Sequence, residues 1–251
     1  LGFLRMCTTG LVAQAQGRSD LQEIENHLVR GLILAFSLGF LFVIATPLVH
    51  LVTGAMLTAS DTVETLMQDY VGIRLLAVPA ALANMVLLGC IFGRQQMRLA
   101  MVQIIFINLA NLALNLFFVL GLGMTIKGVA LASVVAQWTG LAVTLGLVGW
   151  HWRDLLAGAG RRIFTRHPAW LDPATFLRFF EIGSDITIRT VLILLSEAVL
   201  LNLAAGISDL SLAATQLILV MFGLISFTLD GFAHAAEALV GEAVGRRHLL
   251  M

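Results

Sequence analysis

The sequence predicts an all-α, polytopic membrane protein, a bundle of helices that cross a lipid bilayer. Of its 251 residues, 59% are hydrophobic and only 12% are charged, whereas a soluble domain carries about 25% charged residues. The mean hydropathy is +0.94, and apolar stretches of the roughly 20 residues that a spanning helix needs recur along the chain. The chain has too few polar groups to cover its surface, so lipid must cover it.

The apolar stretches give the order of the expected helices. Residues 1–16 form the end of one span, and Pro47 and Pro79 are expected to kink two later spans. Small residues and scattered Ser, Thr and Asn side chains inside the stretches favour close packing between helices. The full spans are predicted at 31–57, 71–93, 99–121, 127–150, 186–206 and 211–236.

The basic residues predict how the helices are oriented. Arginines gather in every second connection, at 17–30, 94–98, 151–183 and after 245. The intervening connections carry acidic residues and a single basic residue, Lys127. By the positive-inside rule the arginine-rich connections are cytoplasmic. The sequence therefore predicts a multi-pass protein of the cell (inner) membrane.

One short segment occurs twice, once near each end of the chain. Leu11–Arg18 reads LVAQAQGR and Leu239–Arg246 reads LVGEAVGR, so position 11 recurs at position 239, an offset of 228. Each copy ends a long apolar segment and precedes a polar turn, as expected for the same helix end in two copies of a large repeat. Six helices separate the copies, and an even number means that they point the same way. The repeats are therefore parallel, related by an axis along the membrane normal.

The repeat predicts two lobes of six helices each, and we expect this chain to begin late in the first repeat and to stop early in the second. Residues 1–150 belong to the amino-terminal lobe, 151–183 to a cytoplasmic inter-lobe linker, and 184–251 to the start of the carboxy-terminal lobe. Within the linker, Asp172-Pro173 is a typical helix start. The residues that follow predict either a short amphipathic helix on the membrane interface or a packed linker helix.

Polar residues inside spans are informative because each costs free energy unless it is paired or faces water. Asn108, Asn111 and Asn115 share one helix face, at spacing i, i+3, i+7. On the next helix, Ser133 is expected level with Asn115, and Gln137 level with Asn111. This polar strip is either interhelical hydrogen bonding or a wall that faces a ligand.

A second polar set lies on the last span. Asp230, His234 and Glu237 fall at i, i+4, i+7, on one face in the cytoplasmic half. The neighbouring span carries Asp185 and Arg189, and Arg189 is placed to neutralise Asp230. A structural ion pair is one interpretation of the set, and a proton relay is the other.

The remaining cysteine and charged residues give no pattern that is typical of an enzyme, a metal site or a nucleic-acid-binding surface. Cys7 and Cys90 lie in apolar segments and predict buried, inert thiols. Arg5 is expected to pair outside this chain, and Glu197 is either functional or covered by a helix from elsewhere. No metal-ligand spacing, phosphate-binding loop or catalytic constellation occurs in the sequence, and no basic patch suits a nucleic acid. The sequence predicts a protein that is not an enzyme and needs no metal or other cofactor.

Four segments resemble the multidrug and toxic compound extrusion (MATE) family, and within it the DinF-like branch. They are Phe3–Gly17, Ala80–Gly89, Lys127–Ser133 and Leu229–Glu237. The resemblance runs along the whole chain. It implies a transporter of twelve helices, of which this chain holds the end of the second helix through the eighth.

The resemblance implies secondary active multidrug efflux, in which two lobes rock around a central cavity and export organic cations in exchange for protons or sodium. It implies that Asn111 and the Ser133 hydroxyl face that cavity, while Asn115 stands where the family carries an Asp, and an amide cannot titrate. Asp230, Glu237 and Arg189 match family positions. The full-length protein is expected to be monomeric in the lipid bilayer. The alternatives are a lipid-linked precursor flippase of the same superfamily and a non-transporting fragment or assembly partner.

Overall fold

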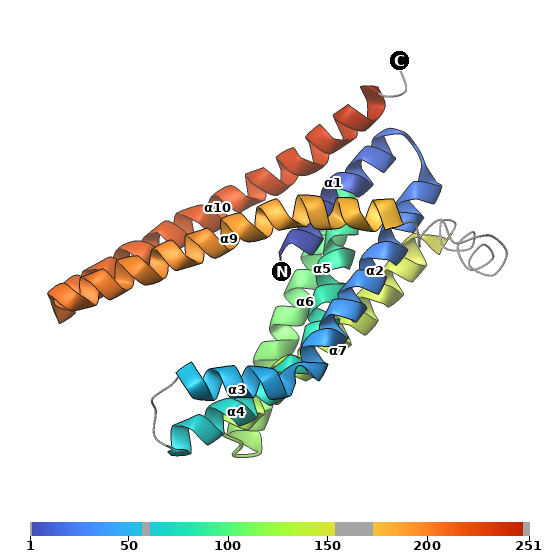
Figure 1. The fold of residues 1–251 in the computed structure, drawn as a ribbon. Coiled ribbons are helices and arrows are strands. Elements are labelled where there is room, and N and C mark those ends of the chain that lie inside the picture. The colour runs from blue at the N-terminus through green and yellow to red at the C-terminus, as the bar shows by residue number, and fades with distance from the viewer. Residues whose placement is uncertain (1, 57–60, 154–172, 248–251) are drawn as a thin grey trace.

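The computed structural model describes residues 2–56, 61–153 and 173–247, and every regular element in these ranges is helical (Figure 1). The predicted all-α fold class is confirmed. The elements in chain order are α1 (Phe3–Gly17), α2 (Leu21–Ile44), α3 (Thr46–Met56), α4 (Asp61–Leu75), α5 (Val78–Gly93), α6 (Met97–Leu116), the π-helical segment η1 (Phe117–Gly121), α7 (Ile126–His151), α9 (Pro173–Ile207) and α10 (Asp209–Arg247).

The helices of the described ranges have the length and composition of membrane spans. Five are long and apolar enough to cross a membrane, and a sixth span results if the bent pair α4–α5 is counted as one. α6 and η1 together agree within two residues with the predicted span 99–121. α7 agrees equally well with the predicted span 127–150. Large apolar side chains such as Leu109 and Phe227 are 60% and 76% exposed. Faces of this kind are stable against lipid or other apolar helices.

The second span begins ten residues earlier than predicted. The Asp20 carboxylate accepts a hydrogen bond from the Glu23 backbone amide at 3.0 Å and so caps α2. Glu23 in turn forms an ion pair with Arg30 at 3.3 Å, two turns further along α2. The predicted connection at 17–30 is therefore wrong: only the turn Arg18–Asp20 joins α1 to α2. Local capping and ion pairing make a helix of a polar stretch that hydropathy assigns to a loop.

Two predicted spans are interrupted where a proline stands in the first turn of the following helix. Residues 31–57 are not one helix, because α2 ends at Ile44 and α3 begins at Thr46, with Pro47 next. The pair α4–α5 is bent by 45°, and Pro79 stands at the start of α5. Proline lacks the N–H group that would continue the preceding helix. Both interruptions fall at the predicted kinks.

The last two helices are longer than the predicted spans. α9 begins at Pro173, as the Asp172-Pro173 motif suggests, but it continues to Ile207 as one helix of 35 residues. The predicted short amphipathic helix is therefore the first part of α9 rather than a separate element. α10 has 39 residues and extends beyond the predicted 211–236, through the second copy of the repeated segment. The division into lobes and linker remains a prediction.

The arrangement in Figure 1 has two parts that meet at α1. One part is the bundle of α2, α5, α6 and α7, with α3 and α4 at one end, and the other is the long α9–α10 hairpin, which diverges from the bundle. α1 packs against α2 and α5 on one side and against α9 and α10 on the other. Fully buried side chains at the centre include Leu4, Val12, Ile24, Leu87 and Ile91. We call the end at which α1, α5 and α10 finish, near Arg18, Arg94 and Arg246, the arginine-rich end.

Candidate functional site

Three of the five residues predicted for the polar strip lie together on the α6–α7 hairpin. Asn111 Nδ2 donates to Ser133 Oγ at 3.0 Å, and Asn115 Nδ2 donates to Asn111 Oδ1 at 2.9 Å. The sequence placed Asn115, not Asn111, level with Ser133, so the observed pair is displaced by one helical turn. The π-helical η1 contributes to this displacement because it alters the advance of the chain per residue. Asn108 is exposed and donates to the carbonyl of Ile104 in its own helix.

The fifth residue, Gln137, belongs to a separate network. Asn84 Nδ2 donates to the Gln137 backbone carbonyl at 2.9 Å and to its Oε1 at 3.0 Å. Gln103 Nε2 donates to the Asn84 carbonyl at 3.0 Å, and both side chains are buried. The network joins α5, α6 and α7. Asn84 and Gln103 are not among the predicted site residues, although each is an amide inside an apolar stretch.

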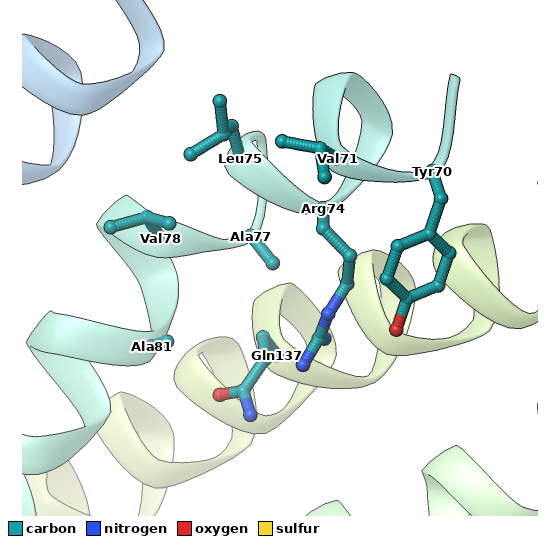
Figure 2. Close-up of a pocket in the computed structure, with 8 residues that line it drawn as sticks. All are labelled: Tyr70, Val71, Arg74, Leu75, Ala77, Val78, Ala81 and Gln137. Atoms are coloured by element: carbon teal, nitrogen blue, oxygen red, sulfur yellow. The ribbon is translucent and has the colours of Figure 1, made fainter. Parts of the chain in front are cut away.

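A cavity of about 430 Å³ lies at the bend between α4 and α5, against α7. Its polar lining is Tyr70, Arg74 and Gln137, and five apolar residues complete it (Figure 2). In Figure 2 the Arg74 side chain extends from α4 toward α7, beside Tyr70 and Gln137. The bend itself is held by Trp138, whose indole Nε1 donates to the Leu76 carbonyl at 3.0 Å. The cavity therefore has a fixed polar end and an apolar body.

A cationic contact joins α1 to α10. Arg5 Nη1 lies 3.2 Å from His234 Nδ1, and the His234 ring stacks on Phe92 of α5 with centroids 5.3 Å apart. The carboxylates of Glu237 and Asp230 lie within electrostatic range of Arg5. Arg5, which was expected to pair outside this chain, has a hydrogen-bonding partner within it, His234. The contact therefore brings the cation of α1 next to His234 of the α10 polar set.

The remaining residues of the second polar set lie on α9. Asp185 and Arg189 are exposed, and within the part of the chain that the structure describes Arg189 does not form the predicted ion pair with Asp230. Glu197 lies in the same helix, partly exposed, in a largely apolar surface. Among the described residues, no three His, Cys, Asp or Glu side chains form a metal-binding group.

The two copies of the repeated segment pack directly against each other. A Cβ added to Gly17 would meet the backbone of Glu242 and Arg246, and one added to Gly245 would meet the backbone of Gln14. The offset of 228 that relates Gly17 to Gly245 also relates Gln14 to Glu242. The two contacts are therefore one contact with the roles exchanged, which is the signature of a local two-fold axis.

The centre of this contact is marked by a pair of equivalent residues. Ala13 and Gly241 share one repeat position, and a Cβ on Gly241 would lie 2.7 Å from the Ala13 Cβ. A residue can face its own equivalent only at the axis itself. At the rim, Gln95 Nε2 donates to the Glu242 carboxylate, which also pairs with Arg246. The parallel repeats predicted from two eight-residue segments therefore meet at the arginine-rich end.

Comparison with known proteins assigns this architecture to a family. Residues 1–117 match the family model described as MatE. The chain is 34% identical over 250 residues, 98% of its length, to DNA damage-inducible protein F of Escherichia coli (strain K12). The chain belongs to the MATE family. The predicted resemblance is thereby confirmed, and with it the expectation of a multi-pass membrane protein that is not an enzyme.

Further relatives and solved structures of MATE proteins agree with this assignment. Protein DETOXIFICATION 42 of Arabidopsis thaliana is 23% identical over 180 residues, 72% of this chain and 33% of its own length. A MATE protein in complex with MaD3S has the same fold, with a TM-score of 0.79 at 20% identity, over 98% of this chain and 54% of that one. The outward-facing conformation of a multidrug resistance MATE transporter gives 0.74 at 19% identity, over 98% and 54%. The chain spans about half the length of the curated relatives it matches, 52% for the Escherichia coli protein.

Proposed function

We propose that this chain forms part of a multidrug antiporter, which exports organic cations in exchange for protons or sodium by alternating access. The observation that carries the proposal is the reciprocal contact of the two repeated segments at the arginine-rich end, while the α9–α10 hairpin diverges from the bundle away from it. Lobes that touch at one end leave a path open at the other. A similar solved structure, described as an outward-facing multidrug resistance transporter, supports this interpretation.

We assign the arginine-rich end to the cytoplasm by the positive-inside rule. Arg18, Arg94 and Arg246 all lie at that end. The reciprocal contact is then a cytoplasmic gate in its closed state. Release of substrate to the outside requires this state, and uptake from the cytoplasm requires that α1 and α10 separate.

We assign substrate binding to the polar strip and to Gln137. Asn115 Oδ1 is buried without a hydrogen-bond partner among the described residues, so a ligand admitted by a movement of the helices would supply the donor that it lacks. Asn111 and Ser133 are already paired with each other, which fixes the orientation of Asn115 through Asn111. Asn108 is exposed on the same helix and is the member with the weakest support. Solved MATE structures in complex with MaD3S and with Br-NRF support a small-molecule partner.

We assign ion coupling to the acidic residues of α10. Asp230 and Glu237 lie within electrostatic range of Arg5, which belongs to α1. Uptake of a proton or sodium ion by either carboxylate weakens its attraction to Arg5, and this eases the separation of α1 from α10. His234 lies between Arg5 and Phe92 and keeps Arg5 in place. Asp185 and Arg189 of α9 are the alternative site of coupling.

The test is to lock the gate in transporting protein. Cys7→Ala and Cys90→Ala first remove the two thiols of the chain. Gln95→Cys and Glu242→Cys then place two new thiols where the native side chains form a hydrogen bond. In proteoliposomes under a pH or sodium gradient, a short cleavable bis-methanethiosulfonate is expected to stop efflux of a dye cation, and reductant to restore it. Each single-cysteine variant is the control and is expected to retain efflux.

Two results would contradict the proposal. Undiminished efflux after complete cross-linking would show that the gate does not open during transport. The absence of gradient-driven efflux before cross-linking, with either ion, would refute the antiporter and bring the flippase alternative forward.

A further inference from the structure

The cavity at the α4–α5 bend has no role in the mechanism proposed above, apart from Gln137. It lies where a membrane span is broken, since α4 ends at Leu75 and α5 begins at Val78 after a 45° bend. In secondary transporters, interrupted helices mark binding sites because the freed helix ends can contact a ligand. Its volume of about 430 Å³ is within the range of small-molecule sites, roughly 300–1,000 Å³.

The charge of the lining selects a class of ligand. Arg74 is the one charged residue among those that line the cavity. Arg74 stands in the last turn of α4, and its side chain is exposed. The nearest acid on α4, Asp69, is engaged by Lys127 at 2.8 Å, and no described carboxylate forms an ion pair with Arg74. The guanidinium is therefore available, and its planar fork matches a carboxylate.

The other groups at the cavity fit the same class. α5 begins at Val78 and α4 ends at Leu75, so the positive end of one helix dipole and the negative end of the other both lie at the cavity, and Arg74 supplies its net charge. The Tyr70 hydroxyl and the Gln137 amide add neutral hydrogen-bonding groups beside Arg74 (Figure 2). Val71, Leu75 and Ala81 form part of the apolar remainder. An organic cation finds no acidic partner in this lining.

We propose that this cavity binds amphipathic organic anions, with the carboxylate of the ligand on Arg74 and its apolar body along α4 and α5. The transporter then accepts an anionic class of compound besides the organic cations proposed above. Only the export of the bound anion rests on the proposed function. Binding by itself does not depend on it.

The test compares two probes of nearly the same shape and opposite charge. Radiolabelled 1-naphthaleneacetate and 1-naphthylmethylamine are equilibrated by dialysis with the purified protein in lipid nanodiscs. We expect the acetate to bind and the amine to bind at least ten-fold more weakly. Arg74→Gln is expected to weaken acetate binding at least ten-fold, and Arg74→Lys less, because lysine keeps the charge but loses the bidentate geometry.

Two further variants locate the site. Ala81→Phe fills the cavity and is expected to abolish acetate binding, whereas Arg98→Gln removes an exposed positive charge outside the lining and is expected to leave it unchanged. Circular dichroism and size-exclusion chromatography confirm that each variant is folded. Acetate binding that survives both Arg74→Gln and Ala81→Phe would overturn the proposal, as would tighter binding of the amine. If the unmodified protein binds the acetate but shows no gradient-driven efflux of the dye cation, that result would contradict only the proposed function.

Discussion

Gly17 and Gly245 occupy the same position of the repeated segment, and each lies against the backbone of the helix that carries the other. Neither position has room for a side chain. Two helices that approach through glycine bury backbone against backbone over a short distance. Such a contact has little side-chain interlocking to undo, which suits a gate that closes and opens in every transport cycle.

The first prediction concerns this contact. Gly245→Ala introduces a Cβ that would meet the Gln14 backbone, so α1 and α10 must move apart. We expect a loss of about 1–3 kcal/mol in the stability of the closed state, observed as a lower cross-linking yield between Gln95→Cys and Glu242→Cys. Gly146→Ala is the matched control, because its Cβ would meet nothing within 4 Å. An unchanged yield for Gly245→Ala would argue against the close approach.

The second prediction concerns the buried amide network. Asn84→Ala removes the side-chain donor to Gln137. It also leaves the side-chain amide of Gln103 with one hydrogen-bond acceptor fewer. We expect a destabilisation of about 1–3 kcal/mol, because buried polar groups lose their partners, measured as a lower Tm of the protein in nanodiscs. Asn108→Ala is the control: this amide is exposed and bonds only within its own turn. Equal Tm values for the two variants would refute the prediction.

The third prediction concerns the bend between α4 and α5. Trp138→Phe removes the indole N–H that donates to the Leu76 carbonyl at the break. We expect a loss of about 1 kcal/mol and faster hydrogen exchange of the backbone amides near Leu76, measured by mass spectrometry. Trp150→Phe, at a position that is 76% exposed, is expected to change neither quantity. Exchange that stays the same in both variants would show that another contact holds the bend.

The fourth prediction concerns ion coupling. Under the proposed mechanism, Asp230→Asn removes one of the two carboxylates within electrostatic range of Arg5, so gradient-driven efflux is expected to fall at least ten-fold. Asp185→Asn on α9 is expected to retain efflux, because Asp185 does not face Arg5 in the described structure. Asn115→Asp tests whether an acid in the polar strip adds to coupling. A fall with Asp185→Asn alone would move the coupling site to α9.

The sequence predicts contacts within one helical hairpin, but not contacts between helices that are distant along the chain. Asn111 and Ser133 lie 22 positions apart, on one hairpin, so helical spacing and a tight turn suffice to bring them near each other. Asn84 and Gln137 lie 53 positions apart, on helices that are not joined by a hairpin. Nothing local specifies which face of α5 packs against α7, so that partner is decided by the packing of the whole bundle.

By itself, the sequence determined the helical class, most of the spans and the parallel repeat, while the orientation expected from arginine stays a prediction. Each of these features depends on composition or on local periodicity, and both can be read from the sequence of an unfolded chain. Only the tertiary structure decided that the copies of the repeat touch across a two-fold axis, that Arg5 contacts His234 of α10, and that a cavity opens at the α4–α5 bend. Those features depend on how helices far apart in the sequence approach each other, and van der Waals packing over the whole bundle determines that approach.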